Sequence, residues 1–207
     1  MVWVFSCAFA VALLLVAEWR GWRLLACFAK PAASASFVAA ALSAGATDSP
    51  YGRWLLAGLI LAALGDVLLL ARQGTPFRLG IYAFLGGHLA YASAFLRAGS
   101  TLPCALVALA AAAPAGYGAL KWLEPHLPAG MQAPVRAYIA VITIMLVTAA
   151  AAAPADWRIT AGATAFYCSD LSVARDRFVR PGLVNRLWGL PLYYTGQLLL
   201  ALTAGHA

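Results

Sequence analysis

The sequence predicts an all-α polytopic membrane protein, a single transmembrane domain over residues 1–207 built as a bundle of about eight helices. Two observations support this prediction. Of the 207 residues, 64% are hydrophobic and only 10% are charged, whereas a soluble domain contains about 45–50% apolar and about 25% charged residues. The apolar residues also form runs of about 20 residues, the length with which an α-helix crosses the hydrocarbon core of a bilayer.

The apolar runs are separated by short loops whose Gly, Pro and Asp residues are turn and helix-stop signals. The first run has two basic residues after it and none before it, the reverse of a secretory signal peptide, so we expect a retained helix. TDSPYG, RQGTP and RAGSTLP separate the runs from the second to the fifth, and AAPADW and RPG separate the last three. The fifth run contains Pro114, which a membrane helix tolerates when its neighbours satisfy the freed carbonyl. The predicted helices are 2–19, 24–44, 51–71, 77–96, 102–122, 133–153, 157–174 and 184–204.

Basic residues gather in one set of loops, which by the positive-inside rule faces the cytoplasm. The opposite loops hold only Arg53, Arg97 and Arg158. We therefore expect both termini outside the cytoplasm, in a bacterial inner membrane. The net charge of +7 acts as a topology signal and a contact surface for anionic membrane lipids, and nothing supports a nucleic-acid partner. The basic set is Arg20, Arg23, Arg72, Arg78, Lys121, Arg136, Arg175, Arg177, Arg180 and Arg186.

Two acidic residues, Asp66 and Asp170, lie inside apolar runs, where a carboxylate costs about 2.5–3.5 kcal/mol on insertion scales. Each lies about a turn and a half before the cytoplasmic end of its helix, and Lys30 lies at a similar distance from the cytoplasmic end of the second helix. All three therefore share one level in the inner leaflet. Because two acids outnumber one intramembrane base, we expect one carboxyl to be neutral and the other ionised, a general acid–base pair.

Further polar residues extend this set. His88 lies deeper, on the same face of the fourth helix as Tyr91. Gln197 lies at a similar depth in the eighth helix, with Tyr193 and Tyr194 about one turn below it. Ser169 precedes Asp170. Each has a structural alternative: interhelical hydrogen bonds for the histidine and glutamine, interfacial anchoring for the tyrosines, and packing for the serine. Lys30 has one too, as a purely structural partner of either acid.

The order of these motifs resembles that of the YhhN, or lysoplasmalogenase-like, family of integral membrane proteins. Each motif is weak alone, but the combination is fairly specific and extends from Lys30 over nearly all the following chain. The motifs are KP at 30–31, LGDVLLL around Asp66, FRLGIYAFLGGHLAYASAF around His88, VRAYIAVITIM at 135–145, TAGATAFYCSDLSVARDRF around Asp170, and LYYTGQLLLA around Gln197.

The resemblance implies a hydrolase that cleaves the vinyl ether bond of lysoplasmalogen, or of a related lysolipid, to a fatty aldehyde and a glycerophospho-headgroup. It implies catalysis by Asp66 and Asp170, without a decision between acid and base and without a metal or cofactor. Protonation of the vinyl carbon gives an oxocarbenium ion that water captures, by the two-carboxylate logic of glycosidases. The residues expected to bind this plasmalogen-type substrate or position water are Lys30, His88, Tyr91, Ser169, Tyr194 and Gln197.

Two other classes of function stay open at this point. Paired acids in membrane helices also mark proton relays, so the alternative is a proton-coupled transporter of small molecules or lipids. Many transporter folds contain an inverted repeat, which we do not find in the sequence. The third possibility is a non-catalytic lipid-binding or scaffolding protein.

Overall fold

The computed structural model describes residues 1–71 and 73–205, and within them the chain forms eight α-helices in the predicted order. No helix end lies more than three residues from its predicted position. Arg72 and His206 lie outside the described residues. The helices are α1 (Val2–Arg20), α2 (Arg23–Ser43), α3 (Pro50–Leu68), α4 (Gly74–Phe95), α5 (Leu102–Leu123), α6 (Gln132–Ala151), α7 (Trp157–Ala174) and α8 (Leu183–Ala201).

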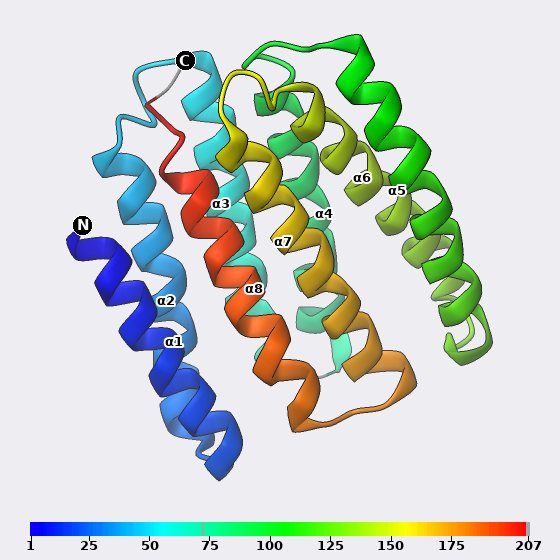
Figure 1. Ribbon diagram of the computed structural model, residues 1–207. Helices are drawn as coiled ribbons and strands as arrows, with labels where there is room; N and C mark the ends of the chain where they lie inside the picture. Colours follow the sequence, from blue (N-terminus) through cyan, green and yellow to red (C-terminus); the bar gives the residue numbers. More distant parts are fainter. Residues whose placement is uncertain (72, 206–207) are drawn as a thin grey trace.

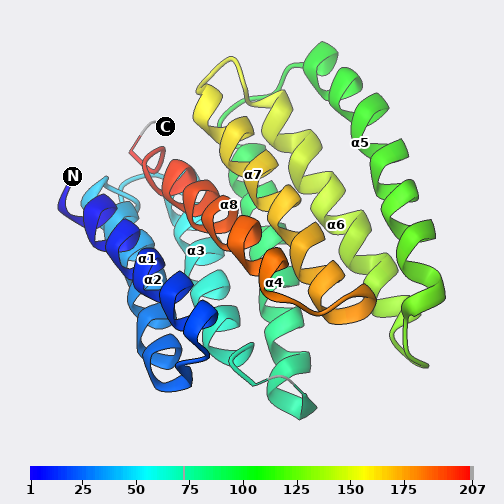
Figure 2. The same ribbon diagram turned by 60° about the horizontal axis from the view of Figure 1, so that its bottom comes forward.

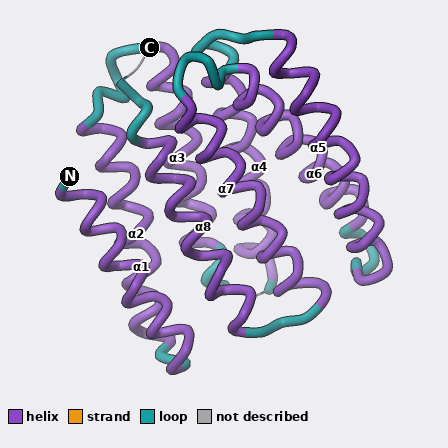
Figure 3. Tube along the Cα trace, viewed as in Figure 1, coloured by secondary structure: helices purple, strands orange, loops and turns teal. Residues whose placement is uncertain are grey.

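The helices run side by side and are joined by loops at the two ends of the bundle (Figures 1 and 3). Both termini lie toward the same end, and the α1–α2, α3–α4, α5–α6 and α7–α8 connections lie at the other, which we call the connection end (Figure 1). In the described chain, seven helices pack in the closed order α1, α2, α3, α4, α6, α7, α8, and α8 also contacts α2 and α3. The remaining helix, α5, packs against the outside of α6 (Figure 2).

By length and composition alone, five helices in the described residues can cross a membrane: α1, α2, α3, α5 together with the turn that follows it, and α6. The other three helices, α4, α7 and α8, contain polar residues within their apolar runs, among them His88, Asp170 and Gln197. A membrane bundle accommodates such helices because neighbouring helices cover their polar faces. The predicted fold class, an all-α membrane bundle, is confirmed.

Glycines allow the close packing of α7 against α8. A Cβ atom added to Gly196 would lie 2.7 Å from the carbonyl oxygen of Gly162, and one added to Gly162 would lie 2.9 Å from the carbonyl oxygen of Gly196. The two backbones therefore touch where neither residue has a side chain, as is common between membrane helices. This contact fixes the height of α8 relative to Asp170 on α7.

Two short elements in the described chain were not predicted: a 3₁₀ turn, Glu124–His126, after α5, and a π-helical turn, Arg175–Val179, after α7. The π turn continues α7 beyond its expected end and carries Asp176 and Arg177 to the edge of the cavity described below. Such turns occur frequently at functional sites.

Candidate active site

A cavity of about 800 Å³ lies inside the bundle and extends to the connection end. Both predicted catalytic residues line it, Asp66 from α3 and Asp170 from α7. Lys30 on α2 and Ser169 on α7 line it as well. Two tyrosines that were not among the predicted site residues, Tyr138 on α6 and Tyr193 on α8, complete its polar lining near the carboxylates.

Asp66 is buried, forms an ion pair with Lys30 and accepts hydrogen bonds from Ser34 and Tyr193. Lys30 Nζ lies 3.2 Å from Oδ1, while Ser34 Oγ and Tyr193 OH donate to Oδ2 at 2.6 and 2.8 Å. Lys30 and Ser34 are four residues apart on α2, so they share one face of that helix. An ionised carboxylate is an acceptor only, and this arrangement supplies donors to both of its oxygens. Only 3% of the Asp66 side chain is exposed.

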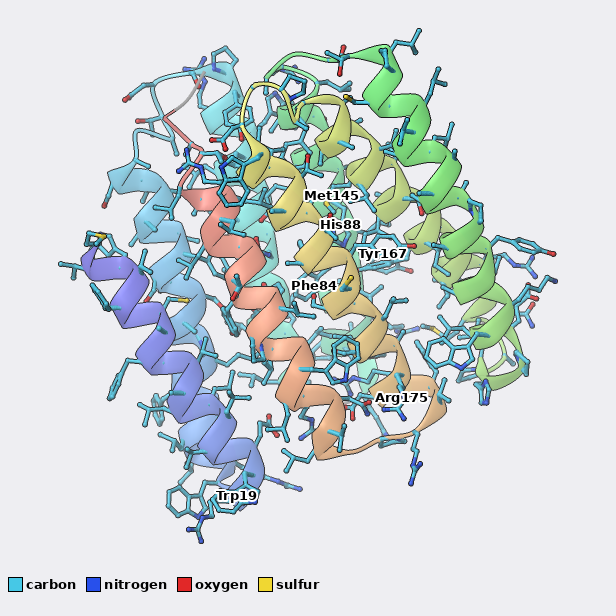
Figure 4. The ribbon with its side chains drawn as sticks, viewed as in Figure 1. Trp19, Phe84, His88, Met145, Tyr167 and Arg175 are labelled. Carbon is cyan, nitrogen blue, oxygen red and sulfur yellow. The ribbon has the colours of Figure 1, made fainter. Side chains whose placement is uncertain are left out.

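Asp170 belongs to a different hydrogen-bonded group. Its Oδ2 accepts from Tyr138 OH at 2.8 Å and lies 3.1 Å from His88 Nε2. The same histidine nitrogen lies 2.9 Å from Tyr138 OH, so the three polar atoms form a triangle. The other ring nitrogen, Nδ1, lies 3.3 Å from Met145 Sδ, and Figure 4 shows His88 beside Met145 in the middle of the bundle. With 16% of its side chain exposed, Asp170 is more open to the cavity than Asp66.

The structure corrects the expectation that Lys30 is the only base near the two acids. The imidazole of His88, expected to lie deeper in the membrane than either acid, reaches Asp170. Side chains on a helix lean toward its N-terminus, and for α4 this direction leads to the connection end. Each carboxyl group therefore has its own basic neighbour, Lys30 for Asp66 and His88 for Asp170.

Four of the residues predicted to bind substrate lie outside the described lining of the cavity: His88, Tyr91, Tyr194 and Gln197. They are buried in the core next to the cavity and bond to other protein groups. Tyr91 OH donates to Gln197 Oε1 at 2.6 Å, with both side chains fully buried, and Gln197 Nε2 has no partner among the described residues. Tyr194 OH donates to the backbone carbonyl of Lys30 at 3.3 Å. Ser169, although it lines the cavity, donates its hydroxyl to the Phe166 carbonyl at 2.7 Å.

Sequence reasoning missed Ser34, and it chose neither Tyr138 nor Tyr193 as a site residue. The two tyrosines occur in the family-like motifs, but tyrosines near helix ends were interpreted as interfacial anchors. Ser34 follows Lys30 by one helical turn, and this spacing is the only signal that indicated it.

Charged residues surround the cavity where it reaches the connection end, and we call Glu18, Asp176, Arg177 and Arg186 the mouth. Arg186 pairs with Glu18 on α1 and lies 3.4 Å from Asp176. Burial alone would raise the pKa of Asp176, but hydrogen bonds from Gly182 N–H and Asn185 and the charge of Arg186 together lower it. The guanidinium of Arg177 lies 4.7 Å from the ring centroid of Phe77. The mouth thus presents charges of both signs.

The fold and this site define a polytopic helical membrane protein with two carboxylates in one internal cavity. The chain belongs to the YhhN family, whose model matches residues 25–204. It is 34% identical over 175 residues to a lysoplasmalogenase of Mycobacterium bovis, an alignment that covers 80% of this chain and 65% of the relative.

It is also 34% identical over 164 residues to the human lysoplasmalogenase TMEM86A, over 75% of this chain and 66% of the relative. The chain is likewise 36% identical over 157 residues to the mouse lysoplasmalogenase TMEM86B. This alignment covers 73% of this chain and 63% of the relative. The chain spans about 65% of the length of the curated relatives it matches. No solved structure matches it. All of α1, including Glu18 of the mouth, lies before the family match.

Proposed function

We propose that this protein is a membrane hydrolase that cleaves the vinyl ether bond of lysoplasmalogen, or of a closely related lysolipid. The observation that carries the proposal is that Asp66 and Asp170, on separate helices, line the same cavity within an apolar bundle. The named activity of the relatives supports the same substrate class.

The reaction adds one water to R–CH=CH–O–R′ and gives the aldehyde R–CH₂–CHO and the alcohol HO–R′. A carboxylic acid transfers its proton to the vinyl carbon that does not carry oxygen, leaving an oxocarbenium ion. Water adds to the cationic carbon and loses a proton to a carboxylate, and the resulting hemiacetal collapses to aldehyde and alcohol. Two carboxyl groups that differ in protonation supply both the acid and the anion that this sequence needs.

We assign the anion to Asp66 and the acid to Asp170. The three donors around Asp66, Lys30 among them, match an ionised carboxylate. Its charge would stabilise the oxocarbenium ion and accept the proton of the attacking water. Asp170 is more exposed to the cavity, and His88 and Tyr138 lie within hydrogen-bond distance of its Oδ2. The proton that Asp66 takes from the attacking water would return to Asp170 through the cavity, which restores the acid after each turnover.

The mouth would hold the polar end of the lipid. Arg177 and Arg186 line the cavity, and a guanidinium binds phosphate oxygens well because its donors form a planar fork. Glu18 and Asp176 are the anionic groups available to an ammonium headgroup. From Asp170 to Asp176 the chain advances six residues, or ~9 Å at ~1.5 Å per helical residue. The mouth therefore lies within reach of a headgroup whose vinyl ether is at Asp170.

We also propose that the mouth faces the cytoplasm of a bacterium, with both termini outside, because the connection end carries Arg20, Arg23, Arg175 and Arg177. Labelling of single cysteines introduced at Thr47 and at Arg180 by an impermeant reagent on intact cells tests this. Labelling at Thr47 alone is expected, and labelling at Arg180 alone would reverse the orientation.

Aldehyde release from lysoplasmalogen by the purified protein in detergent tests the function. Wild-type protein should release aldehyde, and Asp66→Asn and Asp170→Asn should each lower kcat by ~10²–10⁴-fold. An inactive wild type, or a fully active Asn variant, would contradict the proposal. Uptake of intact lysolipid into proteoliposomes without aldehyde release, abolished by the same substitutions, would favour a transporter instead.

A further inference from the structure

A second, shallower hollow of about 370 Å³ lies on the outside of the bundle between α5 and the α7–α8 end. We call it the side groove. Two of its lining residues, Ala119 on α5 and Leu171 on α7, also line the main cavity. These two side chains are therefore the partition between the side groove and the cavity. The side groove is lined by Gly118, Ala119, Trp122, Leu171, Arg175 and Trp188, together with Ala115.

The interior of the bundle is closed beyond the two carboxylates. Phe166 is fully buried and packs against His88, Tyr91 and Tyr193, with ring centroids 4.6, 6.1 and 5.3 Å away. Met145 is fully buried on the far side of His88, and Figure 4 shows both in the middle of the bundle. Cores packed in this way leave no space for a hydrocarbon chain. A long chain whose polar end lies at Asp170 therefore cannot continue along the bundle axis toward the end that holds the termini.

Helix α5 leaves an opening at the side groove. It packs against the outside of α6 rather than within the ring of helices (Figure 2). Three of the four α5 residues that line the side groove are small, Ala115, Gly118 and Ala119, and the fourth is Trp122. A Cβ atom added to Gly118 would meet no heavy atom within 4 Å. Beside Trp122, the α5 side of the groove therefore leaves open space next to the partition.

The chemistry of the side groove is that of a lipid site at the membrane interface. Trp122 and Trp188 are 39% and 37% exposed, and tryptophan is typical of the headgroup level of a bilayer. Arg175 lies beside them, its Nη1 donating to Asn185 Oδ1 at 2.6 Å. The remaining surface of the side groove is apolar.

We infer that the side groove binds the hydrocarbon chain of the lipid substrate, and that the chain passes from the cavity to the membrane between Ala119 and Leu171. This inference rests on the proposed function, since the chain is the one attached to the reacting vinyl ether. The lipid enters sideways from the inner leaflet, with its headgroup moving toward the mouth and its chain remaining in the side groove.

Gly118→Trp, at a position that lines the side groove but not the cavity, tests the inference when two substrates are compared. One is a long-chain lysoplasmalogen in liposomes, and the other is a water-soluble analogue whose short vinyl ether chain ends inside the cavity. We expect kcat/KM for the long chain to fall ~10-fold or more, the effect of about two buried methylene groups, and kcat/KM for the analogue to stay within about twofold. The matched control is Val107→Trp, on an exposed part of α5 outside both hollows, which should change neither value.

Unchanged hydrolysis of the long chain, or an equal loss with both substrates, would overturn the inference. A photoreactive, non-hydrolysable lysolipid with its reactive group at the chain end gives a readout that needs no activity. Labelling of Ala115, Trp122 or Trp188 in wild-type protein, lost in Gly118→Trp, supports the side groove even if no aldehyde is released by the wild type. Labelling confined to other surfaces would overturn it.

Discussion

The imidazole of His88 lies 3.1 Å from the carboxylate of Asp170, although 82 residues separate them in the sequence. Tyr138, from a third helix, lies within hydrogen-bond distance of both. Three helices, α4, α6 and α7, thus converge on one oxygen atom, while α2 and α8 supply the donors for Asp66. The two acids occupy one cavity with separate hydrogen-bond environments, which is how two carboxyl groups come to play different roles.

Removing the hydroxyl next to Asp170 should impair catalysis more than folding. In Tyr138→Phe we expect kcat to fall about 10- to 100-fold, because Asp170 becomes a carboxylate as it gives up its proton, and a hydrogen bond to a charged group contributes about 1.5–3 kcal/mol. The control is Tyr51→Phe, which loses a buried hydrogen bond, 2.6 Å to Thr203 Oγ1, near the termini. It should lose about 0.5–1.5 kcal/mol of stability and keep its activity. Equal activity losses in the two variants would argue against a role for the triangle.

Lys30 should stabilise the fold only while Asp66 is present. Lys30→Met leaves a buried carboxylate without its cation, which costs about 3–5 kcal/mol. The double variant Lys30→Met/Asp66→Asn removes both charges and should recover much of this loss. A double-mutant cycle compares wild-type protein, Lys30→Met, Asp66→Asn and the double variant. The free energy of unfolding of each is measured with denaturant in mixed micelles. Strictly additive effects would mean that the 3.2 Å contact contributes no coupling energy.

The stabilising contribution of Asp176 at the mouth should disappear in acid. Because the folded protein lowers the pKa of Asp176 below its ordinary value of 3.8, ionised Asp176 stabilises the folded state above that pH. This contribution is lost as the pH falls through the lowered pKa of the folded state. The thermal stability of wild-type protein minus that of Asp176→Asn should therefore be constant above about pH 5 and shrink below pH 3.8. A difference that grows as the pH falls would contradict the assignment.

The contact between α7 and α8 should not accept a methyl group. Gly196→Ala would place a Cβ atom 2.7 Å from the Gly162 carbonyl oxygen, so we expect a loss of about 1–3 kcal/mol as the helices move apart. Gly118→Ala, on a helix surface with open space around it, is the control and should be neutral or stabilising by up to about 1 kcal/mol. Denaturant unfolding measures the stability of both variants. Equal stabilities would show that α7 and α8 can accommodate the added methyl group without cost.

Much of the fold was predictable because lipid requires long apolar runs and the loops between them carry turn residues. The two acids stood out for the same reason, since a carboxyl group in an apolar run is costly. What hydropathy does not encode is the rotation of each helix about its axis. This is why His88 reaches Asp170 unexpectedly, and why Tyr91 and Gln197 bond to each other behind the cavity. Tyr138 and Tyr193 were not chosen as site residues because interfacial and buried tyrosines look alike in sequence.

The central claim, hydrolysis initiated by protonation of the vinyl carbon, is tested most directly by the masses of both products formed in ¹⁸O-enriched D₂O. The aldehyde is trapped as it forms. The claim predicts one deuterium on the aldehyde carbon next to the carbonyl, no ¹⁸O in the glycerophospho product, and loss of both products in Asp170→Asn. Deuterium-free aldehyde, or ¹⁸O in the glycerophospho product, would contradict it.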